Sequence, residues 1–136
     1  MLKGLIGRVF GTRHERERKR VQPVLTEIHE IEARLASLSD EEIQGQTAKF
    51  RGVLAERTGP IESRMAELKT AKYNSADPAE RERIDLELQG ADGRGGVEGE
   101  LRTGIAEVLD ELLPEAFATV REACRRLKGS TVMVTG

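Results

Sequence analysis

The sequence of 136 residues has no tryptophan, one tyrosine, three phenylalanines and one cysteine. Aromatic residues amount to only 3%, which disfavours β-sandwiches and barrels. The single Cys124 excludes an intramolecular disulfide and a cysteine-rich metal site, and it favours a reducing compartment. No apolar run approaches the roughly 20 residues of a membrane span. The first residues also lack the hydrophobic core and the small-residue cleavage site of a signal peptide. With 38% hydrophobic and 34% charged residues, the composition predicts a soluble helical protein.

Groups that catalysis requires are missing as well. The dipeptide Gly-Lys occurs nowhere, so the sequence contains no Gly-x-x-x-x-Gly-Lys-Ser/Thr phosphate loop. His14 and His29 lie fifteen residues apart without a ligand partner one helical turn away, which favours solvent exposure over metal binding. Cys124 falls on an apolar stripe, where a buried, inert thiol is expected. We therefore assign no catalytic, cofactor-binding or metal-ligating residue, and we expect the chain alone to be inactive as an enzyme.

Charge is distributed unevenly along the chain. Residues 1–20 contain seven Lys or Arg against two Glu, a formal charge of +5, whereas the whole chain has a net charge of -2. The basic end is therefore a candidate surface for anionic lipid or an acidic protein partner. A basic helical nucleic-acid binder is a weaker interpretation than the two given at the end of this section. Glu15 and Glu17 interleave with the basic cluster at Arg16–Arg20, and no aromatic residue lies beside it to stack on bases.

Residues 1–11 form the first predicted segment, a short amphipathic helix. Its apolar residues lie within about 140° of a helical wheel, and its two cations lie outside that arc. Three glycines weaken the helix in water, so we expect it to be stabilised by a bilayer interface or by a partner. The alternative is a frayed terminus that docks on its own core. The predicted membrane or channel contacts are Leu2, Lys3, Leu5, Ile6, Arg8, Val9 and Phe10.

Residues 12–57 predict a helical hairpin. Its first helix, interrupted at Pro23, has apolar residues at alternating steps of three and four, the spacing of a helix that packs along its length: Val21, Val24, Ile28, Ile31, Leu35 and Leu38. Ser39 and Glu42 have the spacing of a capping box and predict the start of the second helix. The second stripe continues through Ile43, Thr47, Phe50 and Leu54.

Residues 58–96 predict a second pair of helices and a glycine-rich loop. Gly59-Pro60 is expected to open one helix, and Asp77 with Pro78 to cap and open the next. Residues 90–96 then predict an exposed linker, since they lack the spacing of a phosphate-binding glycine loop. We expect residues 58–96 to be an insertion that the fold does not require.

Residues 97–136 predict helical spacing that resumes at Val97, followed by a helix over 113–127 with Pro114 in its first turn. One apolar stripe of this helix is expected to be buried, and we expect Arg121 to be a solvated charge on another side. The last residues, 130–136, predict an unpaired strand-like tail. The apolar stripe of the 113–127 helix that is expected to be buried consists of Phe117, Val120, Cys124 and Leu127. The predicted fold class is thus all-α, a set of helical hairpins or a small helical bundle.

Three strings in this sequence resemble the N-terminal segment of SecA, the motor of bacterial preprotein translocation. The first string is Leu-Pro-Glu-Ala-Phe-Ala-Thr-Val-Arg-Glu-Ala, which begins at Leu113. The second is Leu-Ser-Asp-Glu-Glu, which begins at Leu38 and is followed by Thr47, Ala48, Phe50 and Arg51. The third is the amphipathic basic start from Met1 to Arg13. The resemblance covers roughly residues 1–56 and 107–128. The 97–136 region would then lead into a truncated nucleotide-binding domain.

This resemblance implies a translocase subunit that couples ATP hydrolysis to preprotein transport through the SecYEG channel. It implies Mg and ATP as cofactors of the full-length family. It also implies anionic phospholipid as a partner and a cytoplasmic location, peripherally associated with the inner face of the cell membrane. The family's nucleotide contacts have no counterpart among these residues, so none is transferred and no cofactor is expected in this chain. The alternative interpretation is an autonomous helical adaptor that docks on a membrane or a protein partner.

Overall fold

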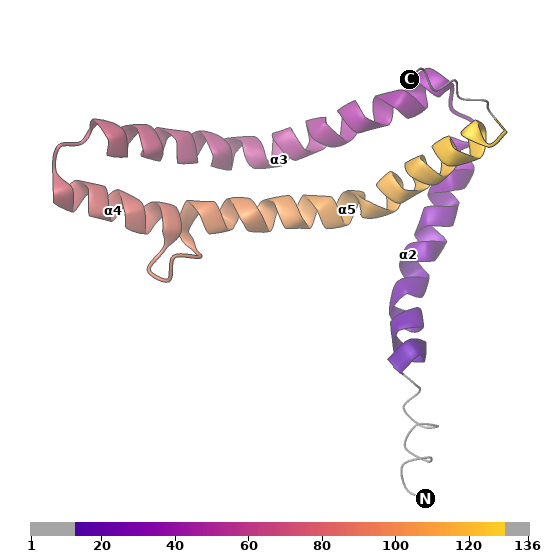
Figure 1. Cartoon of the computed structure of the whole chain (residues 1–136), viewed down its shortest axis with the longest axis horizontal. Helices are drawn as coiled ribbons and strands as arrows, with labels where there is room; N and C mark the ends of the chain where they lie inside the picture. The colour runs from indigo at the N-terminus through magenta and orange to yellow at the C-terminus, as the bar shows by residue number, and fades with distance from the viewer. Residues whose placement is uncertain (1–12, 130–136) are drawn as a thin grey trace, which may run out of the picture. The chain divides into compact units, whose positions relative to one another are not determined.

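The computed structural model describes residues 13–129, and this part of the chain consists of four helices joined by short connections (Figure 1). Helix α2 spans Arg13–Leu35, α3 spans Asp40–Asn74, α4 spans Pro78–Gln89 and α5 spans Gly96–Leu127. No strand occurs between residues 13 and 129, so the all-α prediction is confirmed. The predicted amphipathic segment and the predicted strand-like tail lie outside the described residues.

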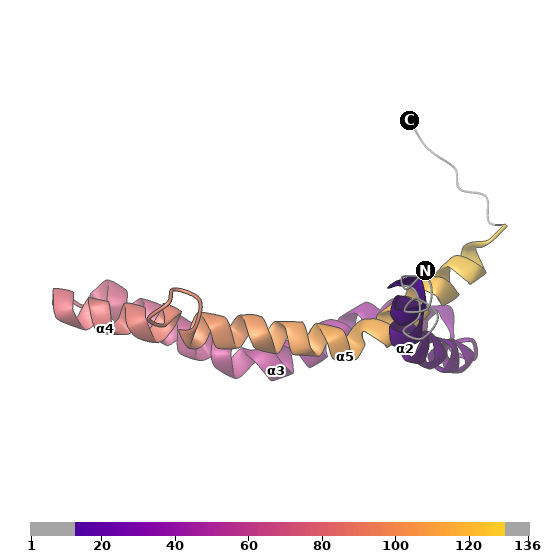
Figure 2. The same ribbon diagram turned by 90° about the horizontal axis from the view of Figure 1, so that it is seen from below.

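The chain divides into two compact units, and the two longest helices contribute to both. The first unit comprises residues 1–44 and 114–136, and therefore contains α2, the first turn of α3 and the second part of α5. The second unit comprises Gly45–Leu113. Figures 1 and 2 both show that, within the second unit, α4 and the first part of α5 follow one another along α3.

Local sequence signals determine where the turns before α4 and before α5 form in the second unit. Asp77 caps α4 by accepting a hydrogen bond from the backbone N–H of Ala79 at 3.0 Å, and Pro78 occupies the first turn, as predicted. Residues 90–96 form the predicted linker. Gly96 has a φ of +60°, and a side chain there would collide with the backbone of α4, so this position requires glycine. Glycine at this position therefore allows the backbone at the start of α5 to approach the end of α4 closely.

Side chains from all three helices of the second unit are buried. Thr58 of α3 is almost fully buried, and its hydroxyl donates to the carbonyl of Leu54 at 2.9 Å. The buried side chains that α4 and the part of α5 up to Leu113 contribute to this unit are aliphatic. Ion pairs also join α3 to α4 and to α5: Arg64 to Glu87 at 2.8 Å, Lys72 to Asp85 at 2.5 Å and Arg57 to Glu111 at 3.2 Å. These pairs are exposed, so burial of Ile84, Leu88, Val97 and Val108 supplies most of the stabilisation.

The first unit has its own apolar core. Ser39 and Glu42 form the predicted capping box at the start of α3: the Ser39 N–H donates to Glu42 Oε2 at 2.7 Å, and the Glu42 N–H donates to Ser39 Oγ at 3.2 Å. The core joins α2, α3 and α5 through Ile28, Ile31, Leu35, Ile43 and Ala118, with Val24, Leu38 and Ala123 packed at its edge. The predicted packing of the α2 seam is confirmed from Val24 onward, whereas Val21 is exposed.

Three predicted helix boundaries are wrong, and each involves proline. Pro23 lies inside α2, Pro60 inside α3 and Pro114 inside α5. An interior proline costs a helix about 3 kcal/mol because it removes one hydrogen bond and crowds the preceding turn. Tertiary burial on both sides of Pro60, at Thr58 and Ile61, offsets this cost in α3. At Pro23 the residues before the proline are exposed, and only the later part of α2, from Val24 and Ile28 onward, is packed.

The continuity of α3 changes the expectation for residues 58–96. The predicted boundary at residue 57 falls inside this helix, and the segment shares the second unit with residues 45–57 and 97–113. Whether the segment is an insertion relative to the family stays a prediction. Its removal, however, takes away half of a shared core, so the structure argues against the expectation that the fold does not require it.

Deleting residues 58–96 and joining the ends with a short Gly/Ser linker should abolish the cooperative unfolding of the second unit. The deletion removes Thr58, Ile84 and Leu88, and it leaves Val97 and Val108 without the side chains of α4. Amide hydrogen exchange measured residue by residue would report the result. Retained protection of the amides of residues 100–112 at the level of the intact chain would contradict this expectation.

Candidate functional site

The described residues contain no constellation that points to catalysis. Between residues 13 and 129, no group of three or more His, Cys, Asp or Glu side chains could hold a metal ion. No helix in that range is both long enough and apolar enough to cross a membrane. The predicted contact residues Leu2, Lys3, Leu5, Ile6, Arg8, Val9 and Phe10 lie outside the described residues. Candidate function must therefore be sought in the surfaces of the two units.

A buried ionic cluster on α5 organises the first unit. Only 3% of Glu122 is exposed, and its carboxylate accepts hydrogen bonds from two arginines on the next turn. Arg125 donates from Nε and Nη2, each at 2.7 Å, and Arg126 donates from Nε at 2.7 Å. These hydrogen bonds from Arg125 and Arg126 lower the pKa of Glu122 to about 2. The carboxylate is thus held in its charged form at all ordinary pH values.

Arg126 extends this cluster to the turn between α2 and α3. Its Nη1 donates to Asp40 Oδ1 at 2.6 Å, and its Nη2 donates to the backbone carbonyls of Leu35 at 3.2 Å and Leu38 at 2.7 Å. Carbonyls at the C-terminal end of a helix lack intrahelical partners, and a cation there complements the helix dipole. One side chain therefore fixes the end of α2 and the start of α3 against α5.

A second ion pair supports the same packing. Arg121 Nε lies 2.9 Å from Glu32 Oε1 of α2, so Arg121 is not the purely solvated charge that the sequence predicted. We refer to Glu32, Asp40, Arg121, Glu122 and Arg126 as the ionic clamp. Arg125 and Arg126 also stand in the last turn of α5, where cations complement the helix dipole. The spacing of Glu122 from them, three and four residues, was the signal that could have identified the pair.

The apolar stripe of α5 that the sequence predicted to be buried is exposed. Phe117 is 53% exposed, and Val120, Cys124 and Leu127 are exposed as well. The buried positions are instead Pro114, Ala118 and Glu122, spaced four residues apart. Ala118 has no exposed surface, and its small side chain permits close contact with α2 and α3. The predictions of a buried stripe and of an inert, buried Cys124 are both wrong for the described chain.

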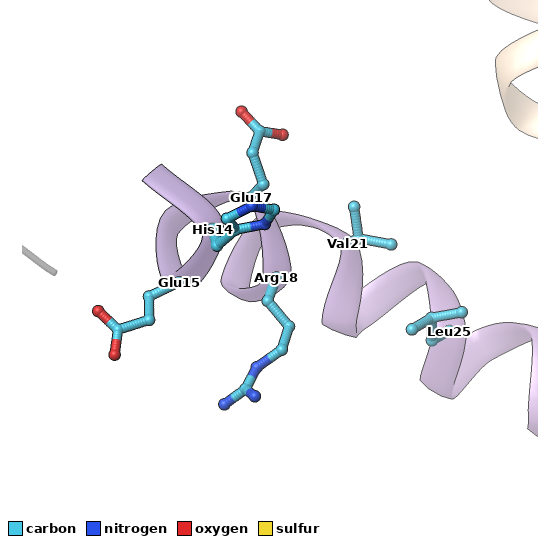
Figure 3. A pocket seen from close by; sticks show the side chains of 6 residues that line it. All are labelled: His14, Glu15, Glu17, Arg18, Val21 and Leu25. Carbon is cyan, nitrogen blue, oxygen red and sulfur yellow. The ribbon is translucent and has the colours of Figure 1, made fainter. Parts of the chain in front are cut away.

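The start of α2 presents a second uncovered surface. Residues 14–23 are all exposed. A hollow of about 490 Å³ lies along this part of the helix, with Val21 and Leu25 at one end of it and charged or polar side chains at the other (Figure 3). The residues that line it are His14, Glu15, Glu17, Arg18, Val21 and Leu25. His14 is exposed, as predicted, and so is His29, which is paired with Glu32 at 3.1 Å.

These features define a class of protein segment before any relative is considered. The described chain is a helical scaffold, closed by buried charge and aliphatic packing, with apolar surface left exposed on α2 and α5. Exposed apolar surface of this kind is typical of contacts with other molecules or other domains.

Comparison with known proteins identifies the family. Residues 6–134 match the SecA DEAD-like domain family. The Protein translocase subunit SecA of Chlorobaculum tepidum is 35% identical over 138 residues, and that of Chlorobium phaeobacteroides is 38% identical over 138 residues. Each alignment covers 100% of this chain and 13% of the relative. No solved structure matches the chain. The chain belongs to the SecA family, and it spans about 13% of the length of these relatives.

Replacing Glu122 by Gln should lower stability much more than replacing Arg125 by Gln. The first change leaves Arg126 without its buried counter-charge, whereas the Arg125 side chain is 64% exposed and its loss leaves the Glu122–Arg126 pair in place. Urea unfolding at pH 7 would measure both variants. Equal midpoints for the two variants would contradict the clamp.

The same group predicts a pH dependence. Because the pKa of Glu122 falls from its usual value of 4.5 to about 2 on folding, its contribution is complete above about pH 4.5 and is lost as the pH falls towards 2. Glu122→Gln should therefore flatten the loss of stability between these two pH values. The measurement is the urea midpoint as a function of pH.

Phe117 and Ala118 provide a matched test of which face of α5 is buried. Phe117→Ala should change the free energy of unfolding by less than about 1 kcal/mol, since the ring is half exposed, whereas Ala118→Leu should cost about 1–3 kcal/mol by overpacking. Thermal or urea unfolding distinguishes them. A larger cost at Phe117 would restore the stripe predicted from the sequence.

Proposed function

We propose that this chain acts as the N-terminal part of a SecA-type translocase subunit, which as a whole couples ATP hydrolysis to preprotein transport through the SecYEG channel. The observation that carries the proposal is the match of the family over residues 6–134, together with relatives aligned along the whole chain. Because the chain spans about 13% of those relatives, the activity, preprotein substrate and channel partner belong to the proposal.

The residues of this chain do not fit a nucleotide site. A phosphate loop needs a lysine after its last glycine, and the sequence has no Gly-Lys pair. The linker at residues 90–96 is also occupied by its own contacts, since Asp92 Oδ1 accepts from the N–H groups of Arg94 and Gly95 at 3.0 Å each. These hydrogen bonds lower the pKa of Asp92 and hold a carboxylate where a phosphate would have to bind. We assign no step of ATP chemistry to this chain.

The proposed role of the segment is docking and packing. Residues 1–11 would contact the inner face of the membrane or the channel through Leu2, Lys3, Leu5, Ile6, Arg8, Val9 and Phe10. The formal charge of +5 over residues 1–20 supports attraction to anionic phospholipid. The exposed side chains Phe117, Val120 and Leu127 support a second contact, in which α5 packs against further parts of the motor.

An autonomous helical adaptor remains the second candidate function. It is favoured by the presence of buried side chains within each of the two units. Reading the genomic DNA after codon 136 separates the two functions. A frame that continues into a Gly-Lys-Thr phosphate loop supports the motor, and a stop codon supports the adaptor. Neither interpretation involves nucleic-acid binding.

Vesicle binding tests the docking role. The chain should bind vesicles containing phosphatidylglycerol and gain helicity there, and binding should weaken as salt screens the charges. Removing residues 1–11 should abolish it. A variant with Lys3→Gln and Arg8→Gln is the matched control, because it keeps the apolar residues and should lose only the preference for anionic over neutral vesicles. Equal binding to neutral vesicles by the unmodified chain would contradict the electrostatic part of the proposal.

A further inference from the structure

The exposed apolar surface of α5 is longer than the stripe predicted from the sequence. Leu109 and Leu113 are 53% and 43% exposed, and at about 100° per residue they fall on the same side of the helix as Phe117. The complete surface covers about 27 Å of one helix within an arc of about 80°. We call it the α5 face, and it consists of Leu109, Leu113, Phe117, Val120, Cys124 and Leu127. A continuous apolar surface of this kind is typical of a protein contact.

Charge along α5 is segregated by sign. Residues 107–115 contain four acidic residues and no Lys or Arg, whereas residues 121–128 contain four Lys or Arg and one Glu. Asp110 and Lys128, which directly follows the helix, both lie about 20° around the helix from Phe117, at one edge of the α5 face. Both are exposed, and neither makes an ion pair within residues 13–129. A matching surface must therefore present positive charge at one end and negative charge at the other.

A second copy of α5 that runs in the opposite direction has this pattern. One antiparallel register places three pairs of positions opposite each other, to within one residue: Phe117 and Val120, Leu113 and Cys124, and Asp110 and Lys128. The same edge of each helix meets in an antiparallel pair, so each contact occurs twice. In a parallel pair Asp110 would lie about 27 Å along the axis from Lys128. Only the antiparallel arrangement covers the apolar residues and also joins opposite charges.

We propose that two copies of this chain associate through the α5 face, with their α5 helices antiparallel. The contact is self-complementary, because each copy supplies the same apolar side chains and one member of each ion pair. It goes beyond the proposed function and does not depend on it. Packing of α5 on further parts of the motor would use the same face, so that contact and a second copy exclude each other.

Sedimentation equilibrium tests whether the α5 face joins two copies. The unmodified chain should form dimers as its concentration rises, and Val120→Asp should weaken dimerisation at least tenfold because it buries a charge against an apolar ring. Leu86→Asp is the matched control, since Leu86 is 52% exposed on α4 and lies outside the α5 face. A chain that stays monomeric up to about 1 mM would overturn the proposal, and so would equal weakening by the two variants.

Charge exchange tests the direction of the helices. Asp110→Lys and Lys128→Asp should each weaken the dimer several-fold at low salt, because like charges then meet at both symmetry-related contacts. The variant that carries both changes should recover the affinity of the unmodified chain to within about twofold, since opposite charges face each other again. Independent, additive losses in the double variant would contradict the antiparallel register.

The single cysteine gives a second readout of direction. In the antiparallel register the two Cys124 residues lie about 16 Å apart along the axis, too far for a disulfide, whereas a parallel pair brings them together. Under mild oxidation Leu113→Cys should form an intermolecular disulfide with Cys124 at least ten times faster than Leu86→Cys or the unmodified chain. Equal rates, or rapid cross-linking of the unmodified chain through Cys124, would overturn the antiparallel contact.

Discussion

The first unit depends on the burial of one carboxylate. A charge removed from water is tolerated only when partners satisfy it, and Glu122 is satisfied by Arg125 and Arg126. Arg126 is in turn committed to Asp40 and to two carbonyls at the end of α2. The directional hydrogen bonds of the guanidinium determine how α5 docks on the turn between α2 and α3, which aliphatic packing alone would specify less sharply.

This constraint explains why the apolar stripe of α5 is exposed. A helix can turn only one face towards its neighbours, and the clamp selects the face with Pro114, Ala118 and Glu122. Phe117 and Val120 then point away from the core of the first unit. The exposed surface is a consequence of the clamp. Because the SecA relatives are several times longer than this chain, this surface supports a contact with further protein.

Short-range signals in the sequence predicted the parts of the fold that depend on neighbouring residues. The capping box at Ser39 and Glu42, the helix start at Asp77 and Pro78, and the linker at residues 90–96 all involve contacts within a few positions. The prolines at 60 and 114 misled the prediction because tertiary burial around them, which a local pattern does not contain, outweighs a local helix penalty. The buried face of α5 was missed for a related reason, since hydrophobicity ranks Phe117 above Ala118 and Glu122, whereas steric fit and charge pairing decide which face is buried.

The two uncovered surfaces of the first unit differ in what can cover them. The stripe on α5 is uniformly apolar, so its cover must be a packed protein surface. The hollow on α2 is lined by two aliphatic side chains and by His14, two glutamates and Arg18, so whatever covers it must satisfy charges of both signs.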